Sequence, residues 1–242
     1  MGIVVEFAQP ILIHPITVWG FFAVLSAFVA YKYLESQFIK HKIKLNAFDL
    51  VTVVYTAGLF GSKLHSVAEG NMSGMNYQGG LMFATLGSWI LVRRSGESVS
   101  RISDLSVVAV LLGHGIGRCG CFFSGDGCYG IQTTLPWGMS FPNGHIKTTS
   151  FVHPVPLYEV LVSWTTALIL HNRMNNSKVH SPWDNTSIFL AISGITRFLT
   201  EFVRRHEPIV LGLSSYQIVS IALISLAVVL HVSRPSVKMK SN

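Results

Sequence analysis

The stretch VVAVLLGHGIGRCGCFF, residues 107–123, joins the apolar run of a membrane helix to a cluster of glycine, histidine, arginine and cysteine. With the residues before it, from a helix start expected near the capping residue Asp104, it forms a segment of about the 20 residues that span a hydrocarbon core of about 30 Å. His114 and Arg118 are four residues apart and therefore lie on one face of the expected helix. A charged side chain at this depth is costly, so we expect Arg118 to contact another part of a helical bundle.

The whole chain has the composition of a membrane protein. Of its 242 residues, 50% are hydrophobic and only 12% are charged. The sequence therefore predicts an all-α integral membrane protein, with residues 1–242 as a single polytopic domain because neither a repeat nor an interdomain linker is evident. Seven transmembrane helices are expected, at 11–32, 46–66, 78–94, 103–123, 155–172, 186–204 and 214–233.

The basic residues predict an orientation. Lysine and arginine near the ends of spans favour the cytoplasmic side, and twelve of the eighteen fall on one set of connections. This places the N terminus outside, the C terminus in the cytoplasm, and residues 124–154 in an extracytoplasmic loop. The net charge of +7 is explained by this topology, so it gives no reason to expect nucleic-acid binding.

A second group of charges lies in GITRFLTEFVRRHEP, residues 194–208, where Arg197, Glu201, Arg204 and Arg205 share one helix face. Two interpretations are open. Arg197 and Glu201 form a structural ion pair while the last two arginines extend to the outer interface. Alternatively the arginines bind an anion, for which guanidinium groups are well suited, and phospholipid phosphates are the anions present at this depth.

The three cysteines Cys119, Cys121 and Cys128 raise the question of a metal, with His114 as a fourth ligand. Structural zinc sites usually have paired C-x(2–4)-C ligands, whereas these cysteines follow a C-x-C-x(6)-C pattern. The spacing therefore predicts no metal site, and no other cofactor is expected. A disulfide between Cys121 and Cys128 and plain buried thiols both stay open.

Five segments together resemble one known family. They are GHGIGRCGCFFSGDGCYG (113–130), LPWGMSFP (135–142), HPVPLYEVL (153–161), GITRFLTEF (194–202) and SSYQIVS (214–220). Their ordered set is similar to the prolipoprotein diacylglyceryl transferase family. The resemblance implies a multi-pass enzyme of the bacterial plasma membrane with its active site facing the outer side. Such an enzyme transfers the diacylglyceryl group of phosphatidylglycerol to the thiol of a lipobox cysteine in a prolipoprotein signal peptide, and releases glycerol 1-phosphate.

The resemblance also implies roles for individual residues. Arg118 and Arg197 match the two essential arginines, and Glu201 and Arg204 match the acid and base that follow in the same helix. Further matches to substrate-binding or loop positions are Asp126, Gly130, His153, Tyr158 and Glu159. The family's amides are replaced by Cys121 and Ser124, and its histidine at the start of the third span is replaced by Gln78.

The replacement at Gln78 matters because glutamine cannot accept a proton from the acceptor thiol. His114, close to Arg118, is the first candidate for a compensating base, and His153 and Asp126 are others. Two alternatives to the family activity follow: a divergent paralogue with another lipid donor or acceptor, and a noncatalytic lipid-binding or scaffold protein. An anion transporter would use similar arginines, but transporters commonly show internal repeats that this sequence lacks.

Overall fold

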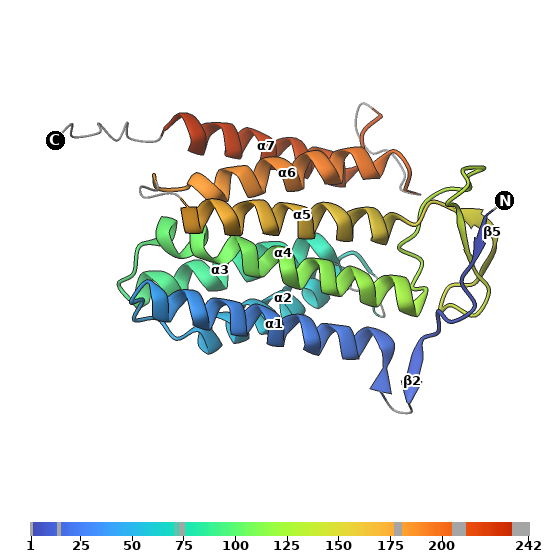
Figure 1. Ribbon diagram of the computed structural model, residues 1–242, viewed down its shortest axis with the longest axis horizontal. Helices are drawn as coiled ribbons and strands as arrows, with labels where there is room; N and C mark the ends of the chain where they lie inside the picture. Colours follow the sequence, from blue (N-terminus) through green and yellow to red (C-terminus); the bar gives the residue numbers. More distant parts are fainter. Residues whose placement is uncertain are drawn as a thin grey trace.

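A computed structural model describes residues 2–13, 16–70, 72, 76–176, 181–204 and 212–233, and is mainly helical (Figure 1). Within these ranges the helices are α1 (Val18–Lys40), α2 (Ala47–Ala68), α3 (Tyr77–Arg94), α4 (Val99–Ser124), α5 (Val155–Asn176), α6 (Asp184–Glu201) and α7 (Ser215–Val232). Five short strands, which the sequence analysis did not predict, accompany them: β1 (Ile3–Val4), β2 (Ile11–Ile13), β3 (Ile16–Thr17), β4 (Met139–Phe141) and β5 (Thr148–Val152). The expectation of an all-α chain therefore needs this correction.

Three of the described helices, α1, α4 and α7, are long and apolar enough to cross a membrane by length and composition. Large apolar side chains also point away from the bundle. Val24 is 72% exposed and Leu168 is 61% exposed, as expected of side chains that face lipid rather than a protein core. The helices are thus consistent with a membrane protein.

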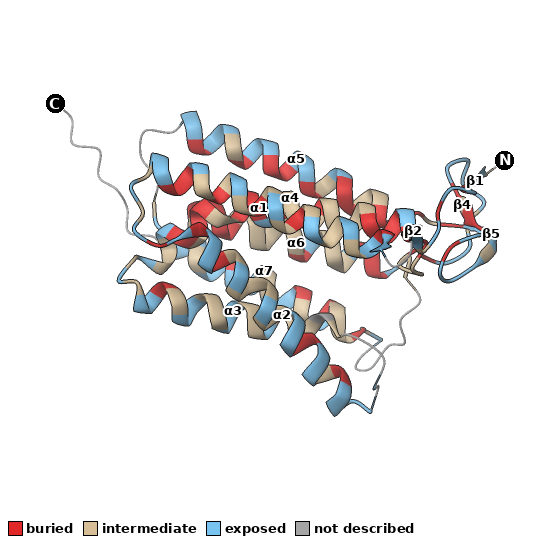
Figure 2. Cartoon of the chain, turned by 90° about the horizontal axis from the view of Figure 1, so that it is seen from below, coloured by how far each residue is buried: buried red, intermediate tan, exposed pale blue. Residues whose placement is uncertain are grey.

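Helix α4 lies at the centre of the bundle. It packs along α1 on one side and α5 on the other, and also contacts α3 and α6, while α2 pairs with α3 and α6 pairs with α7. Buried apolar residues gather where α1, α4 and α5 meet, and include Leu34, Val108 and Leu170 (Figure 2). A central helix with apolar neighbours on several sides can hold a polar side chain away from lipid, which is the arrangement expected for Arg118.

The first helix begins later than predicted. The expected span of 11–32 is observed as Val18–Lys40, and residues Ile11–Ile13 pair instead with Ile16–Thr17 in a two-stranded sheet. The hydroxyl of Thr17 accepts a hydrogen bond from the backbone of Gly20 at 3.0 Å and caps the helix. Apolarity alone did not distinguish the strand from the helix that follows it.

Asp104 has a different partner from the one predicted. Helix α4 begins at Val99, five residues before Asp104, so this carboxylate does not cap its own helix. Its Oδ1 atom accepts hydrogen bonds from the backbone nitrogen of Thr186 at 2.8 Å and from the Thr186 hydroxyl at 2.7 Å. Asp104 therefore caps the first turn of α6 and joins it to α4.

The segment between α4 and α5 folds over one end of the bundle (Figure 1). Strand β4 pairs in parallel with β1 and antiparallel with β5. The buried side chains of Val5, Phe122, Tyr129, Phe141 and Val152 form a small core that joins this sheet to the end of α4. The loop after Arg118 is therefore held by packing against the same helix that carries the arginine.

Candidate functional site

Glu159, in the first turns of α5, lies at the centre of the site. Its side chain is 4% exposed and contacts three guanidinium groups. Oε2 lies 2.6 Å from Nε of Arg118, and Oε1 lies 2.8 Å from Nη2 of Arg204 and 3.7 Å from Nη1 of Arg197. A single buried carboxylate thus brings together arginines from α4, from α6 and from the turn after α6.

Arg197 has further partners on α6 and α7. Its Nη2 atom lies 3.2 Å from Oε2 of Glu201, one helical turn away, as the sequence predicts. Oε1 of Glu201 accepts a hydrogen bond from the Ser214 hydroxyl at 2.7 Å. The guanidinium carbon of Arg197 also lies 4.3 Å from the centre of the Tyr216 ring, a cation–π contact. Arg197 is therefore oriented by side chains of two helices.

His114 and Arg118 share a helix face, as predicted, and are bonded to each other. Nε of Arg118 donates to Nε2 of His114 at 3.3 Å, while Nδ1 of His114 lies 2.9 Å from the Ser163 hydroxyl on α5. Arginine has only donors, so Nε2 must be the unprotonated nitrogen and Nδ1 carries the proton toward Ser163. While this bond holds, the basic lone pair of His114 orients Arg118.

The arginines face a cavity of ≈ 360 Å³, which is lined by residues of α3, α4, α5, α6 and α7 and of the loop after α4. Arg118, Arg197 and Arg204 all line it, as do Glu159 and His114. The remaining wall is largely apolar and includes Val110, Leu111, Val162, Phe189, Leu190 and Leu223. A cavity with an ionic end and apolar walls is shaped for an amphiphile with a charged head.

The ionic groups carry a positive surplus. Three guanidinium groups face two carboxylates, Glu159 and Glu201, which leaves one positive charge. Among the described residues, the buried Nε atoms of Arg197 and Arg204 have no hydrogen-bond partner. Buried unsatisfied donors are costly, and an anion with acceptor oxygens would satisfy them. A phosphodiester carries the single negative charge that would balance the surplus.

Comparison with known proteins shows the family of this chain. The family model described as prolipoprotein diacylglyceryl transferase matches residues 7–233. The chain belongs to the prolipoprotein diacylglyceryl transferase family. This family consists of membrane transferases of lipoprotein biosynthesis, so the resemblance seen in the sequence is confirmed.

Curated relatives share the family at modest identity. A phosphatidylglycerol–prolipoprotein diacylglyceryl transferase of Coxiella burnetii is 35% identical over 135 residues, which cover 56% of this chain and 50% of the relative. The proteins of the same name from Finegoldia magna and Gloeobacter violaceus are 27% identical over 190 residues and 29% identical over 171 residues. These alignments cover 78% and 69% of this chain, and 73% and 62% of the two relatives. The chain thus spans about half the length of the Coxiella relative.

In the loop after α4, the predicted residues Asp126, Cys121 and Ser124 have partners that the sequence did not predict. Asp126, a candidate catalytic base, accepts a hydrogen bond from the backbone of Cys128 at 3.0 Å, and its carboxylate lies beside the thiols of Cys121 and Cys128. Nη1 of Arg118 lies 3.9 Å and 3.8 Å from those two sulfur atoms. The buried Ser124 hydroxyl donates to a backbone carbonyl of its own helix at 2.7 Å. Arg118 therefore faces the thiols of Cys121, one of the two residues that replace the family's amides, and of Cys128.

Gly130, His153 and Tyr158 position the end of this loop. A Cβ atom on Gly130 would lie 2.1 Å from the carbonyl oxygen of Val203, so only glycine fits there. Nδ1 of His153 lies 3.3 Å from the Tyr158 hydroxyl, which accepts a hydrogen bond from Trp137 at 2.9 Å. These residues connect the loop, the start of α5 and the turn after α6.

Three predicted residues remain to be placed: Gln78, Arg204 and Arg205. Gln78 is in the first turn of α3, and its backbone nitrogen is capped by Asn76 at 2.8 Å. The described α3 residue that lines the cavity is Leu81. Arg204 does not extend to the interface: its side chain is 7% exposed and it follows α6, which ends at Glu201. Arg205 lies outside the described residues.

The central position of Glu159 was not predicted from the sequence, where this residue is only part of the match to HPVPLYEVL. A signal was available, because Glu159 is the one acidic residue between positions 155 and 172. An intramembrane carboxylate is by default a functional residue or the partner of a buried cation. Glu159 is therefore recognisable from its position as the shared counterion of the buried arginines.

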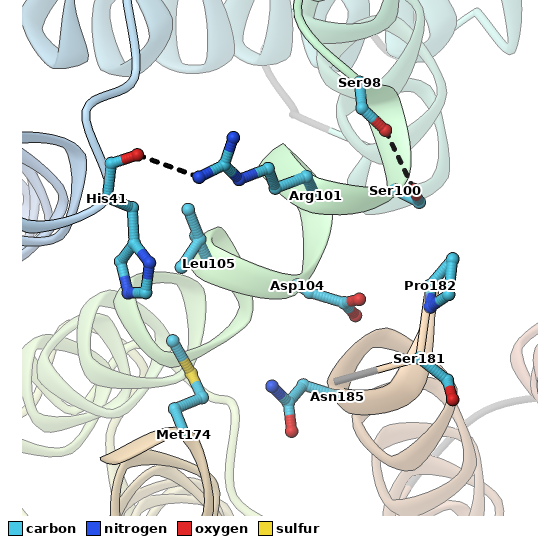
Figure 3. Close-up of a pocket in the computed structure, with 10 residues that line it drawn as sticks. All are labelled: His41, Ser98, Ser100, Arg101, Asp104, Leu105, Met174, Ser181, Pro182 and Asn185. Carbon is cyan, nitrogen blue, oxygen red and sulfur yellow. Dashed lines mark hydrogen bonds between the residues drawn. The ribbon is translucent and has the colours of Figure 1, made fainter. Parts of the chain in front are cut away.

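A second cavity, of ≈ 320 Å³, lies at the opposite end of α4 (Figure 3). Arg101 donates to the backbone oxygen of His41 at 2.8 Å, and the hydroxyls of Ser98 and Ser100 are 3.0 Å apart. The carboxylate of Asp104 there is already bonded to the start of α6. This cavity lacks the convergent buried arginines of the first, so the first is the candidate functional site.

Proposed function

We propose that this protein is a phosphatidylglycerol–prolipoprotein diacylglyceryl transferase, which transfers a diacylglyceryl group to a lipobox cysteine. The observation that carries the proposal is the cavity in which Arg118, Arg197 and Arg204 surround Glu159 at the polar end of apolar walls. The apolar walls of the cavity suit the glyceryl ester region of a phospholipid, and the surplus positive charge of the cluster suits one phosphodiester. The substrate names come from the relatives, and the geometry supports a donor of that chemical class.

In the proposed reaction the arginines act on the phosphate. Attack of a thiolate on the terminal glyceryl carbon breaks the bond from that carbon to a phosphate oxygen, and negative charge grows on the departing phosphate. Arg118 and Arg197 would stabilise this charge in a site that is already organised, because Glu159, Glu201 and His114 hold both guanidinium groups in place. The leaving group is glycerol 1-phosphate.

The membrane arrangement belongs to the same proposal. All seven helices cross the bacterial plasma membrane, with the N terminus outside and the loop of residues 124–154 on the outer side. The distribution of lysine and arginine supports this orientation. A prolipoprotein presents its signal peptide within and at the outer face of this membrane, close to the end of α4 that carries Arg118.

The experiment is a transfer assay with purified protein, phosphatidylglycerol and a peptide containing a lipobox cysteine. The peptide is expected to gain the mass of a diacylglyceryl thioether. Arg118→Ala and Arg197→Ala should each slow transfer by about 100- to 1,000-fold, the effect of losing one donor to a developing oxyanion. Arg173→Ala is the matched control, because Arg173 forms an ion pair with Asp184 at 2.8 Å but is 45% exposed and lies outside the cavity.

The outcomes separate the alternatives. Folded Arg118→Ala protein with near wild-type transfer would contradict the proposed role of the cavity. The replacement of the family histidine by Gln78 favours a noncatalytic lipid-binding protein as the second candidate. That candidate predicts arginine-dependent binding of phosphatidylglycerol without any thioether product. Transfer from another phospholipid, but not from phosphatidylglycerol, would identify a paralogue with a different donor.

A further inference from the structure

Three potential metal ligands meet beside Arg118, at a place where the C-x-C-x(6)-C spacing predicted none. One ligand atom each from Cys121, Asp126 and Cys128 lies within 4.8 Å of the others. Cys121 is in the last turn of α4, and the other two follow in the loop. Gly125 and Gly127, with φ of 58° and 87°, turn the chain back so that Cys128 returns to Cys121. Cys119 is not part of this trio.

The separations are close to those of a metal site. In a tetrahedral zinc site, with Zn–S of about 2.3 Å and Zn–O of about 2.1 Å, neighbouring ligand atoms are roughly 3.5–3.8 Å apart. The ligand atoms of the trio would need to approach one another by about 1.3 Å at most, which side-chain rotation can provide. Three protein ligands leave a fourth position open, and this is the pattern of catalytic rather than structural zinc sites.

The surrounding charges also suit a divalent cation. Two thiolates and one carboxylate carry three negative charges, so a bound M²⁺ leaves a net charge of −1. Nη1 of Arg118 lies 3.9 Å from the sulfur of Cys121 and 3.8 Å from that of Cys128, where it can balance that charge and donate to both sulfur atoms. Donors placed around coordinating sulfur atoms commonly tune metal sites.

The trio is connected to the reaction cavity through Cys128, which lines that cavity together with Arg118. A sulfur atom that enters the cavity therefore comes close to Cys128, one of the three ligands. The two described side chains of this cavity that could accept a proton from that thiol are already engaged: Nε2 of His114 accepts from Arg118, and the Glu159 carboxylate contacts three guanidinium groups. A metal ion deprotonates a coordinating thiol outright, so a base is not required.

We propose that Cys121, Asp126 and Cys128 bind a thiophilic divalent cation, Zn²⁺ or a chemically similar ion, and that this ion activates the acceptor thiol; the second part rests on the proposed function. The acceptor thiol releases its proton to water as it binds the ion. Its sulfur then forms a bond to the terminal glyceryl carbon while the bond from that carbon to the phosphate oxygen breaks. The electron pair leaves with that oxygen as glycerol phosphate, held by Arg118 and Arg197.

The first experiment measures metal binding without any substrate. The purified full-length protein, with its thiols reduced by a phosphine, is titrated with Co²⁺ while the thiolate-to-cobalt absorption band is followed. We expect one equivalent to bind, and Zn²⁺ to displace it. Cys121→Ser and Cys128→Ser should each abolish the band, whereas Cys119→Ser, the control near the end of α4, should retain it.

Two results would overturn the metal site. One is the absence of the band in folded protein whose thiols all react with a thiol reagent. That reaction shows that Cys121 and Cys128 are not joined in a disulfide, so a disulfide would not explain the missing band. The other is a band that survives in Cys128→Ser, which would assign the ion elsewhere. Both results are independent of catalytic activity.

The second experiment tests the role of the ion. A free thiol with a pKa of about 8.5 is only about 3% ionised at pH 7, so removal of the ion with a chelator should slow transfer by about 30-fold there. The difference in transfer rate between the metal-free and the metal-bound protein should become smaller toward pH 9, and it should disappear when one equivalent of Zn²⁺ is restored. Full activity after verified removal of the ion would overturn the role while the transferase function stands. A cysteine-dependent band without transfer by any form would instead overturn the transferase function together with this role.

Discussion

Glu159 provides the sharpest test of how the site is held together. Glu159→Gln keeps the size of the side chain and removes its charge. The carboxylate is buried and contacts three guanidinium groups at 2.6, 2.8 and 3.7 Å. After the substitution the same three arginines face only Glu201, so the surplus of the cluster rises from one positive charge to two.

The expected cost is large. Breaking a buried ion pair by removing one partner destabilises a protein by about 3–5 kcal/mol, because the other charge is left uncompensated. For a chain of this size each kcal/mol lowers the thermal midpoint by about 2–4 °C, so the midpoint of Glu159→Gln should fall by roughly 6–20 °C. Thermal unfolding in detergent, followed by circular dichroism, measures this shift.

A lipid comparison makes the same test specific to the arginines. Phosphatidylglycerol should raise the midpoint of Glu159→Gln by more than that of the wild type, because the variant has the larger positive surplus, whereas a zwitterionic lipid should not distinguish them. Arg173→Gln is the control: this pair is partly exposed, and such pairs contribute about 1 kcal/mol or less. A Glu159→Gln midpoint equal to that of the wild type in lipid-free detergent would refute the reasoning.

Two further substitutions test how the loop and the helices position the site. Gly130→Ala should lower the thermal midpoint and make the loop after α4 sensitive to limited proteolysis, because the added Cβ would lie 2.1 Å from the carbonyl oxygen of Val203. A variant as stable and as protease-resistant as the wild type would contradict this close packing. Asp104→Ala should lower the free energy of unfolding by about 1–2 kcal/mol, seen as a lower thermal midpoint, because the start of α6 loses its side-chain cap. An unchanged midpoint would show that Thr186 finds another acceptor.

Much of the helical arrangement was predictable because it depends on local composition. Each of the seven described helices overlaps a predicted apolar segment, and three of them are long and apolar enough to cross a membrane. The spacing of His114 with Arg118 and of Arg197 with Glu201 predicted contacts that the structure contains. The chain's family was also predictable, because its glycine, arginine and aromatic motifs occur as an ordered set. These features are readable from neighbouring residues alone.

Features that depend on distant residues were not predictable in the same way. Asp104 had the right chemistry for a cap, but its partner, Thr186, is 82 residues away in sequence. The short strands pair residues of β1 with residues of β4, and neither segment is long enough to show a strand period. The first helix was placed too early because Ile11–Ile13 is as apolar as the helix itself.

The composition of the site shows the same division. Arg118, Arg197 and Arg204 were identified because each is a charge in an apolar setting. Their convergence on Glu159 required knowledge of how α4, α5 and α6 pack. Cys119, Cys121 and Cys128 were considered with His114 as a ligand set. The turn through Gly125 and Gly127 instead groups Cys121 and Cys128 with Asp126, and His114 contacts Ser163 and Arg118.

The central claim is that a diacylglyceryl group leaves its phosphate in this cavity and becomes attached to a thiol. The most direct measurement uses phosphatidylglycerol that carries one isotope in the diacylglyceryl part and another in the head group, incubated with the purified protein and a lipobox peptide. The account predicts that mass spectrometry finds the first isotope on the peptide cysteine and the second in water-soluble glycerol phosphate. A peptide that carries the head-group isotope, or neither isotope, would contradict it.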